Sequence, residues 1–180
     1  TRMKMMFENA YAFDNDIGNW DVSNVVEMNR MFYGTNFNHD IGNWDVSKVK
    51  SMEDMFFNNI KFNQDLSDWN VTNVTSMAKM FKNAKSFNSD LNRWSVSNVN
   101  YFQGMFEDAE AFNSSLEDWI LSSVDSTGNG FRNLRFMLDD CGMSQENYES
   151  TLSGWANNTS TPDSTIFSAK NIFLRNRNTR

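Results

Sequence analysis

The sequence predicts an α/β repeat solenoid, in which short parallel strands line one side of a stack of coils and short helical turns line the other. Three columns of large apolar residues recur together about every 25 residues, and self-similarity at a fixed period of about 20–50 residues is the signature of a repeat architecture. The first column holds Trp20, Trp44, Trp69, Trp94 and Trp119. The other two hold Phe13, Phe37, Phe62, Phe87 and Phe112, and the pairs Met6-Phe7, Met31-Phe32, Met55-Phe56, Met80-Phe81 and Met105-Phe106.

One coil, from Phe62 to Phe87, illustrates how each element is predicted. The segment Trp69-Asn70-Val71 alternates apolar and polar residues and is rich in strand formers, so it predicts a short strand. The apolar residues that follow fall three or four positions apart, as on one face of a helix: Val74, Met77, Met80 and Ala84. We therefore expect a helical turn there, with Thr72 or Thr75 as its N-cap. A single coil cannot bury its own apolar face, so stacking has to close the core.

The repeat predicts two regions. Residues 1–131 hold about five coils, and residues 132–180 form a C-terminal capping segment. A helix near residues 145–157 is expected after the N-cap Ser144. Its apolar stripe would cover the open end of the stack. The last residues are expected to be frayed. The chain opens inside a repeat, so we expect the first coil to be truncated and further coils to lie upstream.

Composition and charge exclude several classes of protein. The 16 Lys and Arg residues against 23 Asp and Glu residues give a net charge of −7, and an acidic array disfavours nucleic-acid binding. Cys141 is the sole cysteine, so no internal disulfide forms, and no apolar run is long enough to span a membrane. His39 is the single histidine and has no nucleophile beside it in the sequence. We expect no enzyme activity and no cofactor, and we assign no metal-binding residue.

The repeat text resembles a known family. Residues 62–88 read FNQDLSDWNVTNVTSMAKMFKNAKSFN, which is similar to the BspA-like leucine-rich-repeat surface proteins, including mycoplasma lipoproteins with repeats of this length. Residues 138–156 resemble the closing segment of surface proteins from Bacteroidetes. The resemblance implies a leucine-rich-repeat-like solenoid, export to the cell surface and a role in adhesion or binding. It implies no catalytic activity.

Two columns invite a functional interpretation. The tryptophans could form a platform for sugar rings, but five exposed tryptophans in line would exceed the apolar patches of soluble proteins, so we favour a core role. The acid column, Asp16, Asp40, Asp65 and Asp90, could hold calcium between coils, which needs 6–8 oxygen ligands. Carboxylates that cap turns are the favoured interpretation, and calcium binding stays open.

The favoured function is a non-catalytic binding or adhesion module, secreted or on the cell surface, that recognises a protein or glycan partner. Its candidate surface consists of residues that vary between coils beside the tryptophan column: Asp45, Asn70, Ser95, Lys48, Asn73 and Asn98. The alternative is a structural spacer, or a self-assembling filament or coat element that associates through the ends of the stack.

Overall fold

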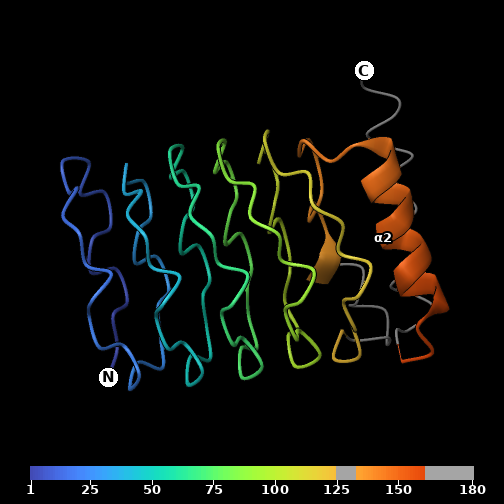
Figure 1. Cartoon of the computed structure of the whole chain (residues 1–180), viewed down its shortest axis with the longest axis horizontal. Coiled ribbons are helices and arrows are strands. Elements are labelled where there is room, and N and C mark those ends of the chain that lie inside the picture. The colour runs from blue at the N-terminus through green and yellow to red at the C-terminus, as the bar shows by residue number, and fades with distance from the viewer. Residues whose placement is uncertain (125–132, 161–180) are drawn as a thin grey trace.

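The computed structural model describes residues 1–124 and 133–160 of the chain. Successive coils lie side by side along the long axis of the molecule, and a helix lies across the end that follows the last coil (Figure 1). This helix is α2, Gln145–Asn157. It is the one helix whose bounds fall within the described residues.

Neighbouring coils are joined by single parallel bridges, and no longer strand is present in the described residues. The bridges run along one column of the stack, which we call the bridge column: Arg2, Glu27, Ser51, Ser76 and Tyr101. The prediction of an α/β repeat solenoid with parallel strands on one side and helical turns on the other is therefore wrong. Trp69-Asn70-Val71 is not a strand, and the segment from Val74 to Ala84 is not helical.

The backbone after the bridge column uses its hydrogen bonds in two directions. The N–H groups of Met77 and Phe81 donate to the next coil, at Tyr101 and Met105. The N–H of Lys79, between them, also donates to the next coil, at Gln103, whereas the N–H of Met80 donates backwards within the same coil, to the Met77 carbonyl. In a strand the N–H groups donate to neighbouring strands, and in a helix they donate to carbonyl oxygens of the same helix. A segment that alternates between these two patterns is therefore neither a strand nor a helix.

This alternation requires left-handed backbone at two positions in each coil. Lys79 has a φ of 56° and Asn83 a φ of 57°. The second position holds residues that tolerate this region best: Asn9, Gly34, Asn58, Asn83, Asp108 and Asp140. Each left-handed residue interrupts a helix, although the buried residues keep a spacing of three or four.

The apolar columns form one continuous core. The predicted core role of the tryptophans is confirmed for Trp44, Trp69, Trp94 and Trp119, which are at most 3% exposed. It does not hold for Trp20 in the first coil, which is 41% exposed. Phenylalanines stack from coil to coil with parallel rings, as Phe56 and Phe81 do at 5.5 Å between centroids. Stacking of this kind adds to the gain from burial alone.

The helix α2 begins at the predicted cap. The Ser144 side chain accepts a hydrogen bond from the backbone N–H of Asn147, and this satisfies one of the unpaired donors at the helix start. Tyr148, Thr151 and Trp155 form its buried face. The apolar stripe expected from the sequence consists of Tyr148, Leu152 and Trp155. Leu152 is only partly buried, and Thr151 is buried in its place.

Candidate functional site

The first surface to consider is the turn edge, the stretch just after each tryptophan, which carries the six residues selected from the sequence. All six are exposed. The Oδ1 atom of Asp45 accepts from the backbone N–H of Ser47 at 3.0 Å. Hydrogen bonding from the Ser47 side chain and then from its backbone lowers the pKa of the carboxyl. Asn70 makes the equivalent contact to Thr72 at 3.2 Å. These side chains therefore close turns, and Ser95 takes the same place in the next coil.

The remaining three candidates on the turn edge connect adjacent coils. Lys48 donates from Nζ to Oδ1 of Asn24 at 2.8 Å. The side-chain amide of Asn73 donates to the carbonyl oxygen of Ser47, also at 2.8 Å. Asn98 repeats this contact one coil later, to the carbonyl of Thr72 at 2.8 Å. The structure thus brings the six candidates together on one edge. Most of their polar groups are already hydrogen-bonded within a coil or to the neighbouring coil.

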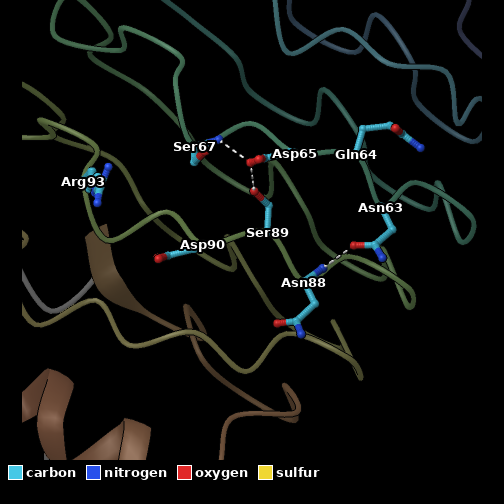
Figure 2. A pocket seen from close by; sticks show the side chains of 8 residues that line it. All are labelled: Asn63, Gln64, Asp65, Ser67, Asn88, Ser89, Asp90 and Arg93. Carbon is cyan, nitrogen blue, oxygen red and sulfur yellow. Dashed lines mark hydrogen bonds between the residues drawn. The ribbon is translucent and has the colours of Figure 1, made fainter.

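The second surface follows the acid column. Each of its carboxylates accepts from a backbone N–H two residues ahead, as Asp16 does from Gly18 at 2.9 Å and Asp40 from Gly42 at 2.8 Å. The prediction that these carboxylates cap turns is confirmed. Between two coils the column borders a hollow of about 400 Å³, lined by Asn63, Gln64, Asp65, Ser67, Asn88, Ser89, Asp90 and Arg93 (Figure 2).

The polar groups of this hollow mainly bond to one another. Figure 2 shows Asp65 between Ser67 and Ser89. Its Oδ1 accepts from the Ser67 N–H at 2.9 Å and from the Ser89 hydroxyl at 3.2 Å, and the contacts from Ser67 and then from Ser89 lower the pKa of Asp65. Within residues 1–124 and 133–160, no three histidine, cysteine or acidic side chains converge in a group that could hold a metal ion. The polar groups that line the hollow therefore mainly hold turns together and do not form a metal site.

The third surface, which we call the ladder face, is the outer side of the bridge column and of the positions just after it. Residues here differ strongly from coil to coil. The bridge column alone carries Arg2, Glu27, Ser51, Ser76 and Tyr101, and the position two residues on carries Lys4, Asn29, Glu53, Ala78 and Gln103. A hollow of about 250 Å³ lies on this face, lined by Glu53, Asp54, Ala78, Lys79, Tyr101 and Gln103.

Aromatic rings and charges of both signs share the ladder face. Tyr101 is 52% exposed at the hollow. Nearer the first coil, the rings of Tyr33 and Phe57 stack with centroids 4.8 Å apart, and the Arg30 guanidinium lies 4.4 Å from the centre of the Tyr33 ring. Partial burial raises the pKa of the Asp54 carboxyl, a shift that nearby Lys79 partly opposes. A protein or a polar ligand would find both contact area and directional groups here.

The ladder face does not emerge from the sequence when the segment after the bridge column is interpreted as a helix. Helical geometry would have scattered these positions around an axis. The signal that could have found the surface is the coil-to-coil variation beside the methionine column. Positions such as Ser51, Ser76 and Tyr101 vary, whereas Met52 and Met77 beside them do not.

The repeat pattern also identifies the family. A family model described as "Mycoplasma protein of unknown function, DUF285" matches residues 1–59 and 35–143. The chain belongs to the DUF285 family. No curated protein matches the chain, and no solved structure matches it. The description of DUF285 assigns no activity, so function has to be argued from the surfaces. Among the described residues of this family member, no helix is long and apolar enough to cross a membrane.

Proposed function

We propose that this chain is a non-catalytic binding or adhesion module, secreted or displayed on a cell surface, that recognises a protein or glycan partner through its ladder face. The observation that carries the proposal is the contrast between constant and varied columns. The core columns repeat with little change, whereas the ladder positions, which range from buried Ser76 to exposed Tyr101, change in charge, size and polarity from coil to coil.

A repeat scaffold suits this role because it presents side chains at fixed intervals without a deep pocket. Neighbouring rungs of a ladder are about 4.8 Å apart, so adjacent coils can contact adjacent groups of an extended partner. Exposed tyrosine and arginine are enriched among residues that dominate binding energy. Tyr101 and Arg30 both lie on the ladder face, and Arg30 is held by an ion pair to Glu8.

The likeness of the repeat text to BspA-like surface proteins supports the same proposal. We propose that the DUF285 repeats of this chain are related to those of BspA-like proteins, and that residues 138–156 are related to the closing segment of Bacteroidetes surface proteins. On that relationship the chain acts outside the cell. Export is tested by fractionating the source cells and probing intact cells with an antibody against the chain.

The binding experiment compares the ladder face with the turn edge. The full chain is applied to glycan arrays, to extracellular matrix proteins and to whole cells. A ladder variant carries Tyr101→Ala, Gln103→Ala and Lys79→Asn, the last chosen because asparagine tolerates left-handed backbone. A turn-edge variant carries Asp45→Asn, Lys48→Ala and Asn73→Ala. Circular dichroism and thermal unfolding first establish that both variants are folded.

We expect the ladder variant to bind about thirtyfold more weakly or worse, because truncating residues that dominate an interface costs upwards of about 2 kcal/mol. The turn-edge variant should retain its affinity. Loss of affinity in the turn-edge variant alone would move the site to Asp45, Asn70, Ser95, Lys48, Asn73 and Asn98. Binding that neither set of changes affects would contradict both assignments.

A further inference from the structure

The hollow on the ladder face differs from the hollow beside Asp65 in the state of its polar groups. We call it the ladder hollow, and its lining consists of Glu53, Asp54, Ala78, Lys79, Tyr101 and Gln103. The Glu53 carboxylate accepts from the Ser76 hydroxyl at 2.6 Å. Four of the other side chains have no hydrogen bond and no ion pair to another described residue: Asp54, Lys79, Tyr101 and Gln103. Beside Asp65, by contrast, most lining groups bond to one another.

The backbone around the ladder hollow is itself fully engaged. Asp54 and Lys79 occupy the same left-handed position of adjacent coils, with φ of 55° and 56°. The N–H of Asp54 donates to the Ala78 carbonyl at 2.9 Å, and the N–H of Lys79 donates to the Gln103 carbonyl at 2.8 Å. The next member of this column is Gly104, so the row of side chains ends at Lys79. A ligand would therefore meet side chains that project from a fixed backbone, which reduces the ordering that binding requires.

The unpaired carboxylate of Asp54 lowers the stability of the free chain. Partial burial raises its pKa, which means that its ionised form is poorly solvated. Asparagine suits left-handed backbone equally well, as Asn58 and Asn83 show, and it carries no charge. A residue that breaks a stability rule without a compensating contact in the fold is a candidate for binding. The free Asp54 carboxylate therefore points to a ligand outside the chain.

The charges at the ladder hollow disfavour an ionised ligand of either sign. Glu53 and Asp54 would repel an anion, and the ammonium group of Lys79 would repel a cation. A neutral ligand avoids both effects. It must still donate hydrogen bonds to the Asp54 carboxylate and accept them from Lys79, because a polar group that is covered without a partner weakens binding. A hydroxyl group can do both.

The volume of the ladder hollow and its aromatic wall restrict the ligand further. The volume of about 250 Å³ lies below the roughly 300–1,000 Å³ of pockets that take drug-sized molecules, so one small ring is admitted. Tyr101, 52% exposed, contributes an apolar ring face and a hydroxyl. A neutral protein side chain carries one hydroxyl or one amide, fewer polar groups than this hollow presents. A sugar ring carries several hydroxyls and an apolar face of C–H groups.

We propose that the ladder hollow is a binding site for one neutral sugar ring of a glycan. The Asp54 carboxylate accepts hydrogen bonds from hydroxyls of the ring, and the nitrogens of Lys79 and Gln103 donate to hydroxyl oxygens. The aromatic ring of Tyr101 packs against the C–H face of the sugar. This inference rests on the proposed function, because it narrows the partner of the ladder face to a glycan.

The test measures the binding of free sugars to the full chain. The probes are the methyl glycosides of glucose, galactose, mannose and N-acetylglucosamine, and the charged counterparts are methyl glucuronide and methyl glucosaminide. Saturation transfer from protein to sugar, followed by NMR, detects weak binding by single rings. The same proteins are applied to an array of neutral and charged glycans. The variants are Asp54→Asn and Tyr101→Ala, and the matched control is Asp68→Asn, because Asp68 is exposed and lies outside the ladder hollow.

We expect at least one neutral glycoside and the neutral glycans that contain it to bind, and the charged sugars to bind more weakly. Asp54→Asn should weaken binding about tenfold, because it replaces charge-assisted hydrogen bonds with neutral ones. Tyr101→Ala should weaken it about tenfold or more, because the apolar contact is lost. Asp68→Asn should bind as the parent chain does. Thermal unfolding verifies that each variant is folded, and Asp54→Asn is expected to be the more stable protein.

Two results would overturn the sugar assignment. One is that no neutral glycoside or glycan binds, or that Asp54→Asn and Tyr101→Ala leave such binding unchanged. The other is a charged sugar that binds more tightly than every neutral one. If the assignment fails while the ladder variant loses its affinity for a matrix protein, the ladder face binds protein and the proposed function stands. If the ladder variant keeps its affinity for every target, the proposed function fails at its own test.

Discussion

The indole Nε1 of Trp155 donates a hydrogen bond to the carbonyl oxygen of Leu116 at 2.8 Å. Inside the stack, Trp94 makes the same bond to Leu66 at 2.9 Å. The helix α2 therefore supplies the tryptophan that a further coil would bring, although its backbone has a different form. The bond continues the column of indole hydrogen bonds that Trp44, Trp69, Trp94 and Trp119 make in the coils before it.

Helix α2 continues a second column as well. The hydroxyl of Thr151 accepts from the backbone N–H of Leu116 at 2.9 Å, as the Ser89 hydroxyl accepts from Leu66 at 3.0 Å. Two contacts to one residue, one to its carbonyl and one to its N–H, fix the helix in register with the last coil. The cap thus closes the core and leaves both backbone groups of Leu116 paired.

The first prediction concerns this cap. Trp155→Phe should destabilise the chain by about 1–3 kcal/mol, because it leaves the buried Leu116 carbonyl without a donor. Trp20→Phe is the matched control, since Trp20 is exposed and its indole bonds to no described residue, and it should change stability far less. Urea denaturation followed by circular dichroism measures both. Equal effects would mean that the contact to Leu116 contributes nothing.

The second prediction concerns the centre of the tryptophan column. Trp69 is 3% exposed and donates to the Ile41 carbonyl at 3.0 Å. Trp69→Ala should cost about 3–5 kcal/mol, as is usual when a large buried ring is removed. The neighbouring change Asp68→Ala, at an exposed position, should stay within about 0.5 kcal/mol. Similar costs in equilibrium unfolding would show that the ring is not part of the core.

The sequence was sufficient to predict the repeat, its period and most of its core, because burial follows the spacing of apolar residues whatever backbone carries them. It was insufficient to predict the secondary structure. Val74, Met77 and Met80 are buried at helical spacing, yet left-handed residues such as Lys79 break the helix. Lysine has no preference for that conformation, so nothing local indicates it. The position is fixed by bonds to the next coil, which lies one full repeat further along the chain.

The choice of the candidate site from the sequence has a similar limit, because contacts between and within coils decide which side chains are free. Variation between coils was a sound criterion, but it was applied beside the tryptophan column, where the structure places turns. Asp45 and Asn70 differ chemically and still make one kind of contact, because both carry an oxygen that can accept from the N–H two residues ahead. Variation therefore indicates a free surface only where the side chain has no bond to its own turn, as at Tyr101.

The third prediction follows from the turn carboxylates. Hydrogen bonds from Ser47 lower the pKa of Asp45 below its usual value of 3.8, and those from Ser67 lower the pKa of Asp65. A lowered folded pKa contributes stability that is present above the unfolded pKa and is lost as the pH falls through the folded value. The chain should therefore lose stability as the pH drops below about 4.

The charge dependence of this effect is tested with Asp45→Asn and Asp65→Asn together. Asparagine keeps the accepting oxygen, as Asn70 does naturally, so stability near neutral pH should change little. The double variant should show a shallower loss than the parent chain as the pH falls below about 4, because two of the titrating groups are gone. Parallel curves for the two proteins would exclude these carboxylates as the cause.

The fourth prediction concerns a carboxyl group whose pKa is shifted in the opposite direction. Partial burial raises the pKa of Asp54, so its contribution to stability is present below the unfolded pKa and is lost as the pH rises through the folded value. Asp54→Asn removes the ionised form and suits the φ of 55° at this position. It should stabilise the chain at neutral pH by about 0.5–1 kcal/mol, at the lower end of such gains because solvent screens the charge.

The control for this change is Asp68→Asn, since Asp68 is exposed and does not have a left-handed φ. Thermal unfolding at neutral pH should raise the Tm for Asp54→Asn and leave it unchanged for Asp68→Asn. The advantage of Asp54→Asn should shrink in acid, where the carboxyl of the parent chain is already protonated. A gain that does not vary with pH would assign the effect to the backbone alone.

The last prediction concerns the one coil that is shorter than the others. Phe37 follows Phe32 by five positions, whereas Phe62 follows Phe56 by six. Asn59, fully buried in the next coil, lies against this shortened turn. Its amide donates to the Phe37 carbonyl at 2.9 Å and to the Thr35 hydroxyl at 3.2 Å.

The corresponding positions of later coils hold alanine, at Ala84 and Ala109, which indicates that the asparagine compensates for the deletion. Asn59→Ala should therefore cost about 1–3 kcal/mol by leaving the Phe37 carbonyl unpaired. Inserting one residue after Thr35 should restore much of that loss in the Asn59→Ala background and should not stabilise the parent chain. Stability measured for the four proteins of this cycle gives the coupling between the two changes. Strictly additive effects would show that Asn59 and the short turn are independent.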